Sequence, residues 1–312
     1  MADNRNQHTV PQVYLKRFVN NASQLYVFDK HTKNSFGPTN VRNVGAERDY
    51  YNIPTPGEIT AFDTQIVDKI LQASESEFGI LLDEITENLR TRVTDKQKKH
   101  LALHLALQIM RTREFRVSYI ELSKMFLKDI SEAYLKSQDI EGNVQVSVNF
   151  EAVAHGQMML GSPLLSRLTS FLSNCIWFFG INETEQPLYT SDNPIVKKNH
   201  LPSKLRVDDG WLSPGIEINF PISPTIILNI HSRKMYEVSN FTKKLADDLD
   251  GNLIKLEREN VAYYNSLQVV SSYRQVYSKS QDFELAKKIC EDNPEICELD
   301  RARWKKIKDD DK

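Results

Sequence analysis

Four polar side chains that could do chemistry occur at helical spacing in an otherwise apolar stretch. They are His100, His104, Gln108 and Arg111. At about 100° per residue they fall within an arc of roughly 80° on a helix, whereas Leu, Ala, Ile and Met occupy most of the remaining circumference. Because buried polar groups are costly without partners, we predict that this stripe faces polar groups of the N-terminal segment or of the loop around Asp192.

His100 and His104 have the spacing of two metal ligands on one face of a helix. The zinc-protease pattern also requires a glutamate directly after the first histidine, and position 101 is leucine. Since the bare spacing often arises by chance, the residues favour packing histidines over a metal site. We therefore expect purified protein to contain no stoichiometric zinc.

Arg111, together with Arg113 and Arg116, ends the apolar segment. An arginine on a mostly buried helix requires a carboxylate, a set of carbonyl oxygens or a phosphate as its partner. A structural ion pair with Glu75 or Glu77 of the preceding helix is favoured over a phosphate site, because such pairs are common without catalysis.

Two further residues lie where a site could form. His8 stands just ahead of an expected helix that begins at Pro11, where free N–H groups and the helix dipole favour an anion, although His8 could equally be a polar cap. Asp192 lies in Thr190-Ser-Asp-Asn-Pro194, which follows an expected strand. A turn explains that composition, but a carboxylate at a strand end is also well placed to point into a cleft.

The composition excludes several classes of protein. The 312 residues include 40 Lys and Arg against 42 Asp and Glu, so a net charge of −2 creates no global field that would recruit nucleic acid or a membrane surface. Three cysteines without a C-x-x-C pair argue against a disulfide framework. No signal sequence, bilayer-length apolar run, G-x-S-x-G elbow, Walker A loop or G-x-G-x-x-G motif is present. We expect a soluble, cytoplasmic protein with reduced thiols and no membrane partner.

The elements that position these residues are expected to be helical up to about residue 172. Thr94 and Gln97 have the spacing of a capping box, which predicts the start of a long buried central helix from Thr94 to Asp129. The other expected helices are a short one at Pro11, one over Ala61 to Arg90 with a break near Gly79, and one over Glu151 to Leu172 interrupted at Gly161-Ser-Pro163.

Strand-like segments predominate later in the chain. Apolar β-rich runs separated by proline-containing turns predict a sheet mainly between Cys175 and Ile230, with an N-terminal hairpin over residues 24–37 beside it. Residues 240–278 are predicted to be a helix ending in a last strand, and 282–308 a polar helix. This predicts a single α+β domain over residues 1–312, in which a helical layer around the central helix packs on a mainly antiparallel sheet. Its parts are the N-terminal hairpin and helices (1–172), the sheet-rich part (173–280), and the polar C-terminal helix and tail (281–312).

Five short motifs in a fixed order carry a resemblance to a known family. They are H-x-x-P-x-x-Y-L-x-x-F from His8 to Phe18, L-x-x-x-E from Leu71 to Glu75, Gln108-x-x-Arg-Thr112, Ser-Asp-Asn-Pro194, and Phe220-Pro-Ile-Ser-Pro224. Together they resemble the DUF4238 family of uncharacterised, mostly bacterial proteins, from His8 to about Tyr277. Arg113 departs from the proline expected after Arg-Thr. The resemblance implies a fold-level grouping and a set of positions, and no reaction.

The polar residues within these motifs are informative as chemistry. They are His8, Glu75, Gln108, Arg111 and Asp192. A chain that only packed would have little need of all five. They could assemble a cleft with an acid/base histidine, one or two carboxylates that hold Mg²⁺ or polarise water, and an arginine that neutralises a phosphate.

Two functional hypotheses follow from these residues. The first is a phosphodiester- or nucleotide-processing enzyme, such as a nuclease effector of a bacterial toxin or phage-defence system, acting on RNA, DNA or nucleotides. The second is a non-enzymatic interaction or sensing module with a protein partner, in which the five residues form a buried polar network. The hypotheses differ in whether the five side chains converge on a solvent-connected cleft or are sealed inside.

Overall fold

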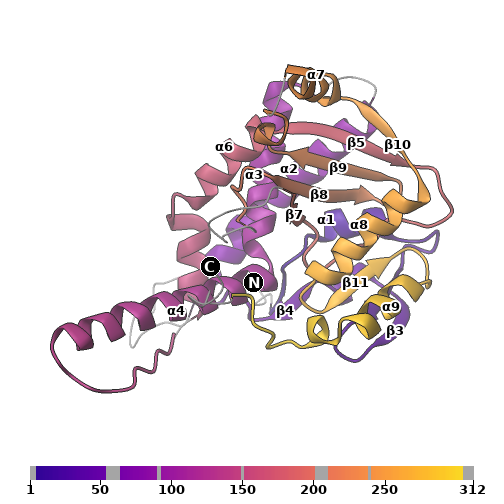
Figure 1. Cartoon of the computed structure of the whole chain (residues 1–312). Coiled ribbons are helices and arrows are strands. Elements are labelled where there is room, and N and C mark those ends of the chain that lie inside the picture. Colours follow the sequence, from indigo (N-terminus) through magenta and orange to yellow (C-terminus); the bar gives the residue numbers. More distant parts are fainter. Residues whose placement is uncertain are drawn as a thin grey trace.

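The computed structural model describes residues 5–53, 64–89, 93–148, 151–200, 210–237 and 240–304. Among these residues, strands form a five-stranded sheet, a four-stranded sheet and a two-stranded ribbon, and helices pack on both faces of the larger sheet (Figure 1). The predicted α+β class is confirmed. The predicted antiparallel pairing is confirmed too, apart from one parallel pair at the edge of the larger sheet.

The larger sheet has the strand order β10-β5-β9-β8-β7. Its strands are β5 (Ile176–Asn182), β7 (Val196–Asn199), β8 (Ile216–Ser223), β9 (Ile226–His231) and β10 (Leu253–Leu256). Four of them come from the region where the sequence predicts the sheet. β10 comes from residues predicted to be helical, so the prediction of an unbroken helix from residue 240 up to the last strand is wrong. The segment instead holds α7 (Asn240–Leu249), a turn at Gly251 with φ of +83°, β10, and α8 (Arg258–Ser271).

One face of this sheet packs against α2 (Ile66–Glu87), α3 (Asp95–Arg111) and α6 (Leu164–Asn174). Ile218 and Phe220 of β8 point into this core because alternate residues of a strand face the same side. The opposite face packs against α7 and α8, a second helical layer that the sequence interpretation did not include. The predicted break of the second helix at Gly79 is wrong: α2 is continuous, and a side chain at Gly79 would contact Val13 of the N-terminal segment.

The predicted central helix is two helices. The capping box of Thr94 and Gln97 is confirmed at the start of α3, and α3 is buried. At Thr112 the backbone turns to an extended ψ of 157°, and α4 (Arg113–Ser137) begins there with the Thr112 hydroxyl accepting a hydrogen bond from the Phe115 N–H at 3.2 Å. The prediction of one buried helix to Asp129 is therefore wrong, since Arg116 and Ile120 are the only buried residues of α4, all of which the structure describes.

The predicted N-terminal hairpin is confirmed, but it belongs to the smaller sheet. That sheet has the order β3-β2-β11-β6, formed by β2 (Leu25–Asp29), β3 (Asn34–Thr39), β6 (Thr190–Ser191) and β11 (Gln275–Ser278). β11 is the predicted last strand, and it pairs with β2 and β6. The two-stranded ribbon joins β1 (Asn6–His8) to β4 (Ala46–Arg48).

Two of the remaining helix boundaries lie next to proline residues. The predicted interruption near Pro163 is confirmed, because α5 (Glu151–Gly156) and a π-helical turn (Gln157–Gly161) end there before α6 begins. The predicted helix over 282–308 is too long: α9 (Glu284–Asp292) ends before Pro294, and residues 305–308 lie outside the described residues. The short helices are α1 (Gln12–Leu15) and 3₁₀ turns at Lys16–Phe18, Val41–Asn43, Arg233–Tyr236 and Pro294–Cys297. No helix in the described part of the chain has the length and apolar character needed to cross a membrane.

Candidate functional site

Four of the five predicted site residues converge where the N-terminal segment crosses the end of α3. Arg111, the last residue of α3, donates from Nη2 to Glu75 Oε1 of α2 at 2.9 Å and to the His8 carbonyl oxygen. One turn earlier, Gln108 Nε2 donates to the Thr9 carbonyl at 3.1 Å. The predicted contact of the polar stripe with the N-terminal segment is confirmed for these two residues. We call His8, Glu75, Gln108 and Arg111 the α3-end cluster.

The α3-end cluster contains two buried side chains and two that are partly exposed. Gln108 and Arg111 are only 2% and 3% exposed, whereas the Glu75 side chain keeps 18% of its surface exposed and His8 is half-buried. In the described structure, one buried polar atom on each of three members has no hydrogen-bond partner: His8 Nε2, Gln108 Oε1 and Arg111 Nε. Unpaired buried polar atoms are costly. Others occur elsewhere in the described residues, on Arg17, Asn219, Asn229 and His231, but these three belong to one cluster with the Arg111–Glu75 ion pair and mark a place suited to water or a polar ligand.

Burial, with a smaller effect from the Arg111 charge, lowers the pKa of His8 to about 4. The imidazole is therefore neutral at pH 7, and whichever of its nitrogens lacks the proton can accept one. An anion bound beside Arg111 would offset the Arg111 charge and stabilise the protonated imidazole, which raises this pKa.

A second set of residues, which the sequence interpretation did not assign to the site, contacts the end of α3 and the start of α4 beside the cluster. Arg116 lies with its guanidinium carbon 3.4 Å from the centre of the Tyr50 ring and donates from Nε to His155 Nδ1 at 3.0 Å. The Tyr51 hydroxyl donates to the Arg111 carbonyl at 2.8 Å, and the Tyr50 hydroxyl to the Thr112 carbonyl at 3.3 Å. Adjacent tyrosines and a second arginine were visible in the sequence, but His155 lies in no pattern that would have identified it.

The fifth residue, Asp192, is in a different environment. Its carboxylate accepts hydrogen bonds from the backbone N–H groups of Tyr273, Arg274 and Gln275 at 2.8, 2.7 and 2.7 Å. Burial raises its pKa to about 6 although these three donors oppose the rise. The carboxylate thus fixes the backbone at the start of β11. Within the described residues, no hydrogen bond or ion pair joins Asp192 to the α3-end cluster.

The two histidines of the stripe face α2, so for them the predicted contact with the N-terminal segment or the Asp192 loop is wrong. His104 stacks on Phe78 with ring centres 5.3 Å apart, and the exposed His100 has its Nδ1 3.7 Å from a Glu77 carboxylate oxygen. This is the packing arrangement favoured from the sequence. Nowhere in the described ranges are three or more His, Cys, Asp or Glu side chains arranged to hold a metal ion.

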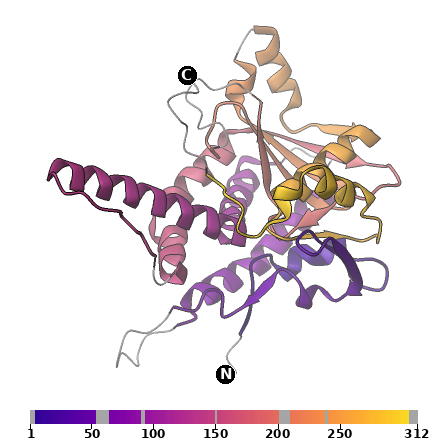
Figure 2. The same cartoon turned by 60° about the horizontal axis from the view of Figure 1, so that its bottom comes forward.

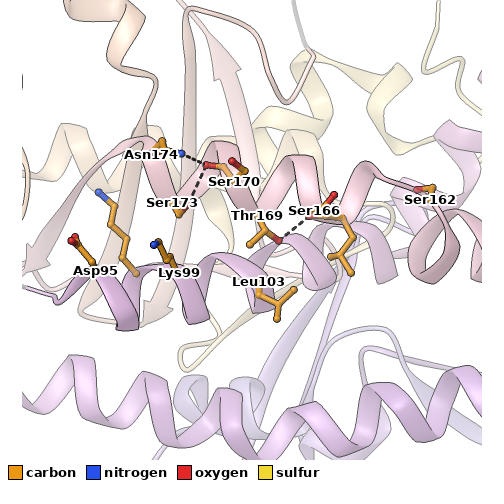
Figure 3. A pocket seen from close by; sticks show the side chains of 11 residues that line it. Asp95, Lys99, Leu103, Ser162, Ser166, Thr169, Ser170, Ser173 and Asn174 are labelled. Atoms are coloured by element: carbon orange, nitrogen blue, oxygen red, sulfur yellow. Dashed lines mark hydrogen bonds between the residues drawn. The ribbon is translucent and has the colours of Figure 1, made fainter.

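Two surface pockets lie away from the α3-end cluster. The larger, a groove of about 870 Å³ between α3 and α6, is lined by Lys99, Leu103 and a row of α6 hydroxyls (Figure 3). Several of these hydroxyls donate to carbonyls of their own helix, as Thr169 does to Leu165 at 2.8 Å. The smaller lies around Glu183 and Lys255. Neither contains any of the five predicted residues.

Substituting His155 should change how stability depends on pH. Burial, followed by the charge of Arg116, lowers the pKa of His155 from 6.5 to about 3, so the folded protein keeps this ring neutral while the unfolded chain takes up a proton below pH 6.5. Relative to His155→Gln, the wild type should therefore lose stability as the pH falls from 6.5 towards 3, by up to about 1.4 kcal/mol per pH unit. Urea unfolding of both proteins across this range measures the difference.

Asp192 has the opposite effect on stability, because its raised pKa makes the folded state bind protons more readily between pH 3.8 and about 6. Both proteins keep Asp192, so its contribution cancels in the comparison of the wild type with His155→Gln. His100→Gln, at an exposed position, is the control and should follow the wild type. A parallel pH dependence of wild type and His155→Gln would show that His155 is not held neutral by the fold.

The fold and the α3-end cluster thus define an α+β protein in which a buried Arg–Glu pair contacts the N-terminal segment. A family model described as "Protein of unknown function (DUF4238)" matches residues 6–282, so the chain belongs to the DUF4238 family, as its five motifs indicated. No curated protein and no solved structure matches the chain. The matched range contains all five predicted site residues and ends before α9.

Proposed function

We propose that this chain is a phosphodiester- or nucleotide-processing enzyme whose site is the α3-end cluster. The observation that carries the proposal is the set of three buried, unpartnered polar atoms around the charged pair of Arg111 and Glu75. A site of this kind offers hydrogen-bond donors and acceptors that water and phosphate oxygens can use. Folded proteins rarely leave such atoms unpaired for packing alone.

The proposed roles follow from the charges of the side chains. Arg111 neutralises a phosphate, and Glu75 fixes the orientation of its guanidinium group through the 2.9 Å bond. His8, neutral at pH 7, acts as the base that takes a proton from the attacking water, and the bound phosphate raises its low pKa towards the useful range. Gln108 Oε1 accepts a hydrogen bond from the same water. Asp192 has no role in the proposed chemistry, because its carboxylate is occupied by backbone donors.

The burial of Arg111 supports a small substrate or a chain end. A guanidinium on a residue that is only 3% exposed is out of reach of the middle of a double helix. The substrate that we propose is therefore a terminal phosphate, which would enter beside the partly exposed Glu75 and His8. We therefore place nucleotides and the ends of RNA or DNA ahead of internal phosphodiester bonds. A nuclease effector in toxin or phage-defence systems is the specific form of this proposal, and Mg²⁺ dependence is part of its test.

Replacing His8 by alanine should abolish activity without unfolding the protein. The fold uses the His8 carbonyl, which the substitution keeps, while its Nε2 makes no hydrogen bond. Loss of a general base lowers kcat by about 10²–10⁴-fold. Turnover of nucleotides, single-stranded RNA and DNA should be measured with EDTA, Mg²⁺ or Mn²⁺, and thermal unfolding measured alongside.

His100→Ala is the matched control, since His100 lies on the same stripe but is exposed and faces Glu77. It should retain wild-type turnover. A wild type that turns over none of these substrates under any metal condition, or a His8→Ala protein as active as the wild type, would contradict the proposed site.

A second candidate is a non-enzymatic interaction or sensing module with a protein partner. One observation favours it: Glu75 and the His8 carbonyl already bind the Arg111 guanidinium group within the chain. On this alternative the α3-end cluster fixes the N-terminal segment. Inactivity across the whole substrate panel, together with unfolding of Arg111 variants, would support it.

A further inference from the structure

The distal part of α4 is an arm that projects from the rest of the molecule (Figures 1 and 2). Its root is held by the C-terminal segment: Arg301 pairs with Glu114 at 2.9 Å, and Trp304 Nε1 donates to the Ser118 carbonyl at 2.8 Å. The last of these anchors is Glu121, which accepts from the Arg303 N–H at 3.0 Å. Residues 122–137 extend beyond this root.

Large apolar side chains gather on one side of the arm. They are Leu122, Phe126, Leu127, Ile130 and Tyr134, each between 41% and 65% exposed. At about 100° per residue they fall within an arc of roughly 140°. We call these five residues the arm stripe, and Ile140, 53% exposed, follows just beyond the helix. A solvated helix normally carries charge on such a face, so the arm stripe marks an interaction surface.

We propose that the arm stripe is a dimer interface that packs against the arm stripe of a second copy of this chain. This inference goes beyond the proposed function and does not depend on it. Side chains exposed to this degree present on the order of 500 Å² of apolar surface, comparable with the largest patch on a typical monomer. Two arms with their polar rims would bury on the order of 1,200 Å², the lower limit for a stable association.

The charges of the arm favour another copy over a charged partner. Residues 121–137 contain three lysines and three acidic residues, a net charge of zero, and all six lie outside the arc of the arm stripe. Nothing in this pattern would recruit nucleic acid or an anionic membrane. An apolar stripe that runs along a projecting helix is best covered by an apolar stripe of the same length. A second copy of the chain, related by two-fold symmetry, provides one.

Light scattering after gel filtration and sedimentation equilibrium test the proposal on the full chain. The wild type should have the mass of two 36.0 kDa chains at micromolar to millimolar concentrations, and Phe126→Glu with Tyr134→Glu should halve that mass. Ile80→Glu is the matched control, because Ile80 on α2 is 60% exposed and lies outside the arm. It should remain dimeric.

A second measurement does not rely on a charge in the interface. Ile130→Cys, treated with a mild thiol oxidant, should form a disulfide between two chains, while the native cysteines, all buried, should form none. A wild type with single-chain mass throughout, or arm variants that stay dimeric, would overturn the proposal. So would arm-dependent binding to lipid vesicles by a monomeric wild type, which would identify the arm stripe as a membrane-docking face.

Discussion

Replacing Arg111 by alanine should lower the free energy of unfolding by about 3–5 kcal/mol, because it leaves the Glu75 carboxylate without its cation and the His8 carbonyl without its hydrogen-bond donor. A domain of ordinary stability tolerates few losses of that size. Arg111→Lys keeps the charge but not the planar fork, so it should cost less stability and still impair any reaction that depends on gripping a phosphate. Urea unfolding measures the first effect, and turnover measures the second.

A double substitution identifies the cause of the Arg111→Ala loss. If the stranded Glu75 carboxylate causes it, Glu75→Gln in the alanine background should restore part of the stability. Arg167→Ala is the control, since Arg167 is exposed on α6 and should change stability by no more than about 0.5 kcal/mol. An Arg111→Ala protein as stable as wild type would show that the buried pair does not hold the N-terminal segment.

Asp192→Ala should be about as damaging, although Asp192 lies outside the α3-end cluster. It removes the acceptor of three backbone N–H groups at once, and each donor left unsatisfied costs about 1–3 kcal/mol. We expect a total loss of about 3–5 kcal/mol, reduced by solvent that reaches the partly buried donors. Thermal unfolding measures this loss, and hydrogen exchange should show reduced protection of the β11 amides.

Asp192→Asn removes the charge but keeps one acceptor oxygen of similar geometry. This variant should therefore lose less stability than Asp192→Ala. Asp247→Ala, at an exposed position whose carboxylate lies 3.6 Å from Arg233, is the control for removing an aspartate. If Asp192→Ala instead unfolds like wild type but loses all turnover, Asp192 acts in the reaction and our assignment of a structural role is wrong.

Local signals in the sequence predicted local structure well. The capping box at Thr94 marks the true start of α3 because both of its partners lie within one turn. Pro163 marks a true break for the same kind of reason, since the ring removes a hydrogen bond wherever the chain folds. The end of α3 at Arg111 combines a local cap, the Thr112 hydroxyl, with hydrogen bonds from the hydroxyls of Tyr50 and Tyr51. These tyrosines are more than fifty residues away in the chain, and no local pattern predicts their contact.

The candidate site was predicted in part for a related reason. From the sequence, Arg111 could be paired with Glu75 or Glu77, because a buried arginine requires a carboxylate partner. The structure pairs it with Glu75. The contact with His8 could not, because Arg111 binds its backbone carbonyl, a group that every residue has. Asp192 was grouped with the other four because the sequence pattern of a turn carboxylate is the same whether the side chain faces a cleft or three backbone donors. In the structure it faces the donors.

The order of strands in the smaller sheet has a consequence for how the chain is made. β2, among the first elements to leave the ribosome, has its permanent neighbour in β11, some 250 residues later. Until then Val27 and Phe28 lie on an open strand edge, which is the kind of surface that invites wrong pairing. The nascent protein must therefore keep its first hairpin from aggregating through nearly the whole of its synthesis. Completion of this sheet by residues 275–278 is a late step, and a chain shortened before β11 would carry that open edge permanently.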